Sequence, residues 1–244
     1  MRSRGLLVTF DAWQTLFTPR EPVATQYARV ARDHGVDVEE SEIELGFRRA
    51  FKEYYKKYPN YGKTAGMSSQ QWWEKVVADS FAPTTIPPAL APALVAHFAT
   101  KEAYILHTSI PFLLQSLRAN TTYDKTVIGV VSNSDCRVLP ILSSLGILVR
   151  NDPQDQRVGI NGTLDFVTLS YDVGVEKPHQ RIFEAAFNTA RRQDDDTERE
   201  WTRVHVGDDV EKDVKAAESA GWRAVLWDGE GEPEDILRKI LGGP

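Results

Sequence analysis

The chain has 244 residues, 41% of them hydrophobic and 26% charged, which is ordinary for a globular protein with a substantial core. A formal net charge of -6, without a block of Lys and Arg, argues against a nucleic-acid partner. No apolar run approaches the roughly 18 residues that span a membrane, and the first residues show no signal-peptide pattern. We expect a cytoplasmic protein with no membrane partner, the nucleus being the alternative. The sequence leaves its oligomeric state open.

The first predicted element is a strand over residues 6–10, LLVTF, followed directly by Asp11. Five residues without a charge indicate a strand that is buried on both faces. In open α/β sheets, ligands bind at the carboxyl ends of the strands. Asp11 is therefore a candidate nucleophile or metal ligand, and the alternative is an acid that only caps a turn.

Helical periodicity dominates the next part of the chain, residues 20–106. Two patterns typical of capping boxes, Ser41–Glu44 and Ser68–Gln71, precede apolar residues at helical spacing. The predicted helices cover residues 23–32, 43–58, a segment from Ser68 through Trp72 and Val77, and 93–104. We therefore predict a smaller helical domain, residues 20–106, inserted after the first strand.

Strands and helices alternate in the rest of the chain. Strands are predicted at 127–131, 166–169, 204–206 and 224–227, and helices at 110–117, 138–145, 181–192, 211–220 and from Pro233 onward. Residues 151–157 are predicted to form an exposed polar loop. This alternation favours an α/β fold with a parallel sheet, built from residues 1–19 and 107–244.

Each of the first four predicted strands ends in polar residues that carry possible chemistry. In chain order they are Asp11 and Thr15, then Ser132 and Asn133, then Lys177, and finally Asp208, Asp209 and Asp213. Each set alone is typical of a helix cap or a turn. The carboxyl ends of parallel strands lie at one edge of the sheet. The occurrence of all four sets of polar residues at such strand ends therefore predicts a single site.

The chemistry of this set favours phosphoryl transfer. Asp11 and Asp208 could share a divalent cation through hard oxygen ligands, and Asp11 could attack phosphorus to form an aspartyl phosphate. The Ser132 hydroxyl and the Lys177 ammonium could hold the other phosphate oxygens. Thr15, which follows Asp11, and Asn133, which follows Ser132, are further candidates for substrate binding. The predicted partner is a small phosphorylated molecule.

The same segments resemble the four motifs of the haloacid dehalogenase superfamily. They are FDAWQTL at 10–16, VSN at 131–133, EKP at 176–178 and VGDDVEKD at 206–213. The resemblance covers the whole chain, and residues 59–62, 71–73 and 205–208 are similar to the subgroup called haloacid dehalogenase-like hydrolase domain-containing protein three. It implies a Rossmann-like core, a helical cap at residues 20–106 and magnesium-dependent hydrolysis of phosphate esters.

Carried over by motif, the resemblance gives each residue a role. Asp11 is the nucleophile and, with Asp208 and the backbone carbonyl of Trp13, a magnesium ligand. Lys177 orients Asp11 and the phosphate, and Ser132 binds the phosphate. Asp209 and Asp213 support the metal site from outside its ligand sphere.

Trp13 departs from the family pattern, since family phosphatases usually have a second Asp at this position that protonates the leaving group. An indole N–H does not titrate and cannot do this. Three interpretations follow: a phosphatase that is slow or borrows an acid such as Asp135 or Asp209, a pseudoenzyme that binds a phosphorylated ligand, and, ranked behind both, a 2-haloacid dehalogenase. Gln14 also replaces the usual Gly of the family.

Overall fold

The computed structural model describes residues 3–150 and 158–242, so the loop predicted at 151–157 lies outside the described residues. The chain forms two compact units. The first, here called the core unit, contains Met1–Thr18, Leu106–Asn133 and Leu142–Pro244. The second, the helical unit, contains Pro19–Ile105 and also the short segment Ser134–Ile141.

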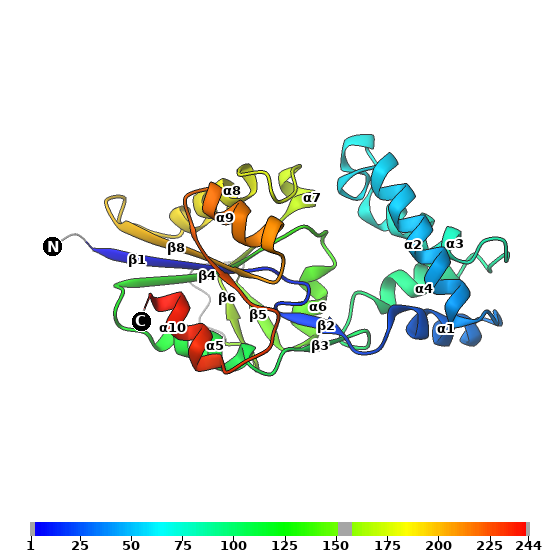
Figure 1. Ribbon diagram of the computed structural model, residues 1–244, viewed down its shortest axis with the longest axis horizontal. Helices are drawn as coiled ribbons and strands as arrows, with labels where there is room; N and C mark the ends of the chain where they lie inside the picture. Colours follow the sequence, from blue (N-terminus) through cyan, green and yellow to red (C-terminus); the bar gives the residue numbers. More distant parts are fainter. Residues whose placement is uncertain (1–2, 151–157, 243–244) are drawn as a thin grey trace. The chain divides into compact units, whose positions relative to one another are not determined.

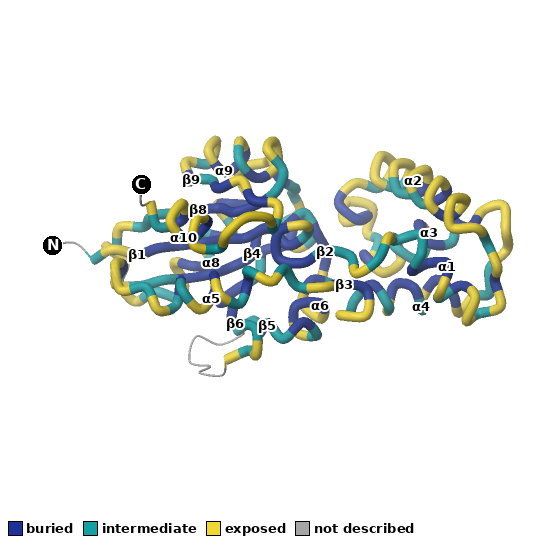
Figure 2. Tube along the Cα trace, turned by 60° about the horizontal axis from the view of Figure 1, so that its bottom comes forward, coloured by how far each residue is buried: buried dark blue, intermediate teal, exposed yellow. Residues whose placement is uncertain are grey.

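The core unit is built on a five-stranded sheet in which every neighbouring pair is parallel (Figure 1). The strand order is β7 (Phe166–Leu169), β4 (Lys125–Ser132), β1 (Arg4–Phe10), β8 (Glu200–Gly207) and β9 (Arg223–Leu226). β1 lies at the centre and is buried from Gly5 to Phe10, as Figure 2 shows for the middle of the sheet. The predicted α/β fold with a parallel sheet is confirmed.

Helices cover both faces of this sheet (Figure 1). On one face, α8 (Arg181–Arg192) packs Ile182, Phe183 and Ala186 into a core that includes Leu7 and Val131 of the sheet. On the other face lie α5 (Ile110–Ala119) and α10 (Pro233–Leu241), each with the predicted proline in its first turn. The short helices α6 (Val138–Ser144) and α7 (Ser170–Val173) follow β4 and β7.

The segment after β8 is helical as predicted but irregular. It begins as a π-helix, η2 (Val210–Lys215), and continues as α9 (Ala216–Ser219). The Asp209 side chain caps its first turn by accepting hydrogen bonds from the backbone N–H groups of Glu211 and Lys212. Asp213 therefore lies in the first turn, close to the end of β8.

The helical unit contains α1 (Val23–Asp33), α2 (Glu40–Lys57), the 3-10 turn η1 (Asn60–Ala65), α3 (Ser69–Ser80) and α4 (Leu90–His97). The capping box predicted at Ser68–Gln71 is confirmed, with both of its hydrogen bonds formed. The capping box predicted at Ser41–Glu44 is wrong. Helix α2 already begins at Glu40, so Ser41 lies inside its first turn and Glu39 takes the capping position.

The helix predicted over residues 93–104 is also wrong at its carboxyl end. Helix α4 ends at His97, and residues Tyr104–Leu106 form the strand β3, which pairs with β2 (Phe17–Pro19). A second small ladder joins β5 (Ile147–Val149) and β6 (Gly162–Leu164). None of the helices within residues 3–150 and 158–242 is long and apolar enough to cross a membrane.

Candidate active site

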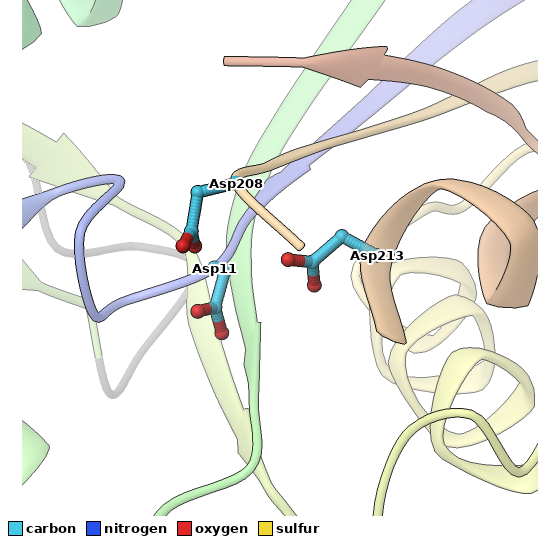
Figure 3. Close-up of side chains that lie close together, drawn as sticks. All are labelled: Asp11, Asp208 and Asp213. Atoms are coloured by element: carbon cyan, nitrogen blue, oxygen red, sulfur yellow. The ribbon is translucent and has the colours of Figure 1, made fainter. Parts of the chain in front are cut away.

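Three of the predicted acids meet at the carboxyl edge of the core sheet. Asp11 follows β1, Asp208 follows β8, and Asp213 projects from η2 towards both (Figure 3). Each offers a carboxylate oxygen, and these oxygens all lie within 4.8 Å of one another. Asp11 is held in place by a backbone hydrogen bond of 2.8 Å from its N–H to the carbonyl of Val206 on the neighbouring strand. Such a set of hard oxygen donors could hold a divalent metal ion.

Lys177 connects two of these acids, Asp11 and Asp213. Its Nζ donates to Asp11 Oδ1 at 2.7 Å, to Asp213 Oδ1 at 2.5 Å and to the backbone carbonyl of Val131 at 2.9 Å. The side chain is almost fully buried, with 4% of the residue exposed. Burial opposes the charge, but the carboxylates of Asp11 and Asp213 outweigh it and raise the pKa of Lys177 above its usual value. An ammonium is therefore fixed beside the Asp11 carboxylate.

Asp213 also contacts His205, which the sequence motifs did not single out as a site residue. The distance from His205 Nε2 to Asp213 Oδ1 is 3.1 Å, and His205 Nδ1 lies 2.8 Å from the Thr9 hydroxyl. Burial opposes the charge of Asp213, but His205 and Lys177 hold its pKa well below the usual range. Burial lowers the pKa of His205, so the neutral ring donates to Asp213 through Nε2 and accepts from Thr9.

A signal for His205 and Thr9 was present in the sequence. Both interrupt apolar strands, LLVTF and VHV, that are otherwise free of polar side chains. A polar side chain in a strand buried on both faces requires a hydrogen-bond partner. Here the two residues are register partners on β1 and β8 and provide that partner for each other.

Gly207 allows the close approach of β8 and η2. A Cβ atom at this position would lie 2.3 Å from Cγ of Asp213, closer than any real contact. Asp208, which follows, is half-buried and accepts a long hydrogen bond of 3.4 Å from the Thr15 hydroxyl. Burial raises the pKa of Asp208, and the nearby carboxylates of Asp11 and Asp213 raise it further. The three acids thus repel one another.

Ser132 and Asn133 lie where β4 ends, and Ser132 is buried. The Asn133 side chain binds the backbone of Lys177 at both groups: Nδ2 donates to the carbonyl at 2.9 Å, and Oδ1 accepts from the N–H at 2.6 Å. This pair of bonds fixes the loop that carries Lys177. The contacts of Asn133 favour a positioning role over direct contact with a substrate.

The turn after Asp11 contains the two departures from the family pattern. The ring of Trp13 packs against Phe17, with centroids 5.9 Å apart, and Trp13 forms a β-bridge with the same residue. Gln14 has a φ of 58°, in the left-handed region that favours glycine. Gln14 therefore adopts, at a conformational cost, a backbone shape that glycine adopts freely.

Neither acid proposed as a substitute proton donor is free. Asp135 accepts from Trp73 Nε1 at 2.8 Å and pairs with Arg137, all within the helical unit. Burial opposes its ionisation, but Arg137 lowers the pKa of Asp135 below the usual value. The hydrogen bonds that Asp209 accepts from backbone N–H groups, the one from Lys212 first, lower its pKa as well.

The sheet order, the four strand-end motifs and the cluster of three acids define the core of a haloacid dehalogenase-type hydrolase. The sequence model of that family, described as haloacid dehalogenase-like hydrolase, matches residues 6–221. The chain belongs to the haloacid dehalogenase-like hydrolase family.

Relatives with similar sequences are known in fungi and animals. The chain is 36% identical over 222 residues to an uncharacterised hydrolase of Schizosaccharomyces pombe, covering 91% of this chain and 90% of that protein. It is 33% identical to mouse haloacid dehalogenase-like hydrolase domain-containing protein 3, covering 94% and 84% of the two chains. The sequence resemblance to that subgroup is therefore confirmed.

A solved structure shares the fold at lower identity. The HAD-hydrolase YfnB from Bacillus subtilis bound to magnesium superposes with a TM-score of 0.63 and 15% identity, covering 99% of this chain and 100% of that one. This likeness supports the Rossmann-like α/β core.

Proposed function

We propose that the protein hydrolyses phosphate esters of small molecules with magnesium as its cofactor, through an aspartyl phosphate at Asp11. The observation that carries the proposal is the position of the Lys177 ammonium, 2.7 Å from the Asp11 carboxylate at the edge of the three-acid cluster. A fixed cation beside a candidate nucleophile, next to a set of metal-binding oxygens, suits a phosphate group better than a neutral substrate.

The acid cluster fits a divalent cation. Asp208 has its pKa raised by burial and by the carboxylates of Asp11 and Asp213, which is the repulsion that a bound cation would relieve. Asp11, Asp208 and the backbone carbonyl of Trp13 would hold magnesium. Once bound, magnesium would neutralise phosphate charge and polarise the phosphoryl group.

The side chains of the site have separate roles in the proposed reaction. A carboxylate oxygen of Asp11 forms a bond to phosphorus while the bond from phosphorus to the ester oxygen breaks, and the leaving alkoxide takes a proton from water. Water then attacks the phosphorus, releasing inorganic phosphate and regenerating Asp11. Lys177 holds the carboxylate in orientation, Ser132 binds phosphate oxygens, and Thr15 positions Asp208 through its 3.4 Å hydrogen bond.

The leaving group lacks an obvious proton source. Trp13 occupies the position of the family acid, while the low pKa values of Asp135 and Asp209 keep both ionised at neutral pH. We therefore expect turnover to be slow for alkyl esters and faster for esters with good leaving groups, because the latter need no proton. The same observation favours a second candidate function, the binding of a phosphorylated ligand without turnover.

A magnesium titration with paired esters separates these two functions. We expect hydrolysis of an aryl phosphate to require magnesium, to exceed that of an alkyl phosphate and to disappear in Asp11→Asn. The exposed Asp172, changed to Asn, is the control for loss of one negative charge. Binding of phosphate without hydrolysis of any ester would favour the second candidate, and release of chloride from a 2-haloacid without magnesium would refute both.

A further inference from the structure

A polar cavity lies at the edge of the core sheet opposite the acid cluster. It has a volume of about 110 Å³ and is lined by Arg118, Lys125, Thr126, Arg150, Asp165 and Gln193, among others. Lys125 opens β4, whereas Ser132 closes it, so the cavity and the acid cluster are separated by the length of that strand, roughly 23 Å for eight residues. All of these residues belong to the core unit.

Positive charge exceeds negative charge around this cavity. Asp165 is its only acidic lining residue among the described residues, and it is shared between Arg118 Nη2 at 2.7 Å and Arg150 Nη1 at 3.2 Å. One oxygen of Asp165 also accepts from the backbone N–H of Ile128 at 2.7 Å. One carboxylate therefore serves two guanidinium groups and a backbone donor.

The third cation, Lys125, is paired only weakly. Its Nζ donates to the backbone carbonyl of Gln193 at 2.5 Å and lies 3.8 Å from the carboxylate of Asp194. That carboxylate is itself held by Arg199 at 2.7 Å. The carboxylate that the structure gives as the ion-pair partner of Lys125 is thus 3.8 Å away and already bound to Arg199.

Three polar atoms at the cavity are buried without a hydrogen-bond partner in the part of the chain that the structure describes. They are Nε of Arg118, Nε of Arg150 and Oγ1 of Thr126. Buried donors are nearly always satisfied in folded proteins, and guanidinium groups bind oxyanions through paired N–H donors. Two of the guanidinium groups that line the cavity thus each keep an N–H that no described residue accepts.

From this arrangement we propose a second anion site, at the amino-terminal end of β4, for a small tetrahedral oxyanion such as inorganic phosphate or the phosphate group of a small metabolite. The volume corresponds to roughly three or four water molecules, which suits the five heavy atoms of such an anion and excludes a nucleotide. Arg118 and Arg150 would bind the anion through their guanidinium groups, and Lys125 would supply further charge. The site is independent of hydrolysis at Asp11.

Titration with inorganic phosphate in the presence of a chelator tests the site. Without a metal ion, the acid cluster of Asp11, Asp208 and Asp213 repels phosphate, so binding reports the second site. We expect saturable shifts of the Arg118 and Arg150 Nε–H signals in NMR spectra, absent when chloride is added at the same ionic strength. Arg150→Gln should weaken binding at least tenfold.

Arg181→Gln is the matched control, since Arg181 is exposed at the far end of the 12-residue helix α8, about 18 Å from Gln193. It should bind phosphate as the wild type does. Ser132→Ala should also bind normally, because Ser132 belongs to the other edge. Any one of three results would overturn the proposal. Ser132→Ala could lose phosphate binding, Arg150→Gln could bind phosphate as tightly as the wild type, or the two Nε–H signals could fail to shift.

The source of the anion is resolved with a second probe. Inorganic phosphate that binds more tightly than glycerol phosphate identifies a free inorganic anion as the ligand. The reverse order identifies the phosphate group of a metabolite. Both orders support the site, and they do so whether or not the protein hydrolyses either compound.

Discussion

In the proposed reaction, Trp13 leaves the departing group without a proton donor. If the missing acid is what limits turnover, Trp13→Asp should raise kcat for alkyl phosphates by about 10²–10⁴-fold, because it restores a group that can give and take a proton. This increase in kcat should depend on pH, because the new carboxyl group adds an ionisation to the pH profile of kcat. Steady-state kinetics with an alkyl ester measure both effects.

Trp13→Asn is the matched control for this change. It removes the same contact with Phe17, whose ring centroid lies 5.9 Å from that of Trp13, but it adds no group that titrates. Equal rates for the Asp and Asn variants would show that proton transfer is not the limiting step, and would favour a protein that binds its ligand without turnover.

Gln14 carries a conformational cost that can be measured. Gln14→Ala and Gln14→Gly both lose the hydrogen bond that the Thr18 hydroxyl donates to Gln14 Oε1 at 2.9 Å. They differ only in the Cβ atom, which is disfavoured at a φ of 58°. The Gly variant should have the higher free energy of unfolding, by about 1 kcal/mol, in urea titrations. A more stable Ala variant would contradict this account.

At the level of single residues, the sequence was informative where a charged side chain ended an apolar run. Asp11 and Asp208 were predicted to approach each other on that ground, and their oxygens do so. The use of Asn133 to hold the backbone of Lys177 could not be predicted, because it depends on two loops 44 positions apart meeting at 2.6 and 2.9 Å.

Between elements, Asp135 links the segment after β4 to helix α3. Its pKa is lowered by Arg137 against the opposing effect of burial, so the pair stabilises the fold above the unfolded pKa of about 3.9. That stabilisation is lost as the pH falls through the lower folded pKa. Trp73 adds a hydrogen bond to Asp135, and its ring lies 4.1 Å from the Arg137 guanidinium carbon.

Asp135→Asn should therefore destabilise the protein by about 3 kcal/mol at pH 7, because it leaves the largely buried Arg137 side chain without its counter-charge. The difference from wild type should shrink below about pH 4, where the carboxylate of the unfolded state begins to protonate while the native carboxylate is still charged. Urea midpoints at pH 7, 5 and 3 measure it. Asp37→Asn, at an exposed site of the helical unit, should change little, and a difference that did not vary with pH would contradict the linkage.

Helices and strands with a clear hydrophobic periodicity were predictable from the sequence, whereas the shortest strands were not. Helices such as α8, with a continuous apolar stripe, were predicted with the right bounds. The strands β2 and β3, at Phe17–Pro19 and Tyr104–Leu106, have three residues each and show no period. Their structure comes from pairing between segments that lie far apart in the chain, which local sequence does not encode.

At the scale of the whole molecule, magnesium binding should appear as added stability. A ligand that binds only the folded state raises the free energy of unfolding by about 2.7 kcal/mol at 100 times its Kd. We expect magnesium to raise the thermal midpoint relative to a chelator, and Asp208→Asn to reduce the shift. Asp172→Asn should retain it. Identical midpoints with magnesium and chelator would count against a metal at the acid cluster.

The chain crosses between its two units at four points, because Ser134–Ile141 belongs with residues 19–105 although it lies far from them in sequence. This pattern has a consequence for protein engineering. A chimaera that grafts only residues 19–105 onto a related scaffold would separate Trp73 from Asp135, its hydrogen-bond acceptor. A compatible transplant has to carry both pieces, and lineages that exchange such modules by recombination face the same constraint.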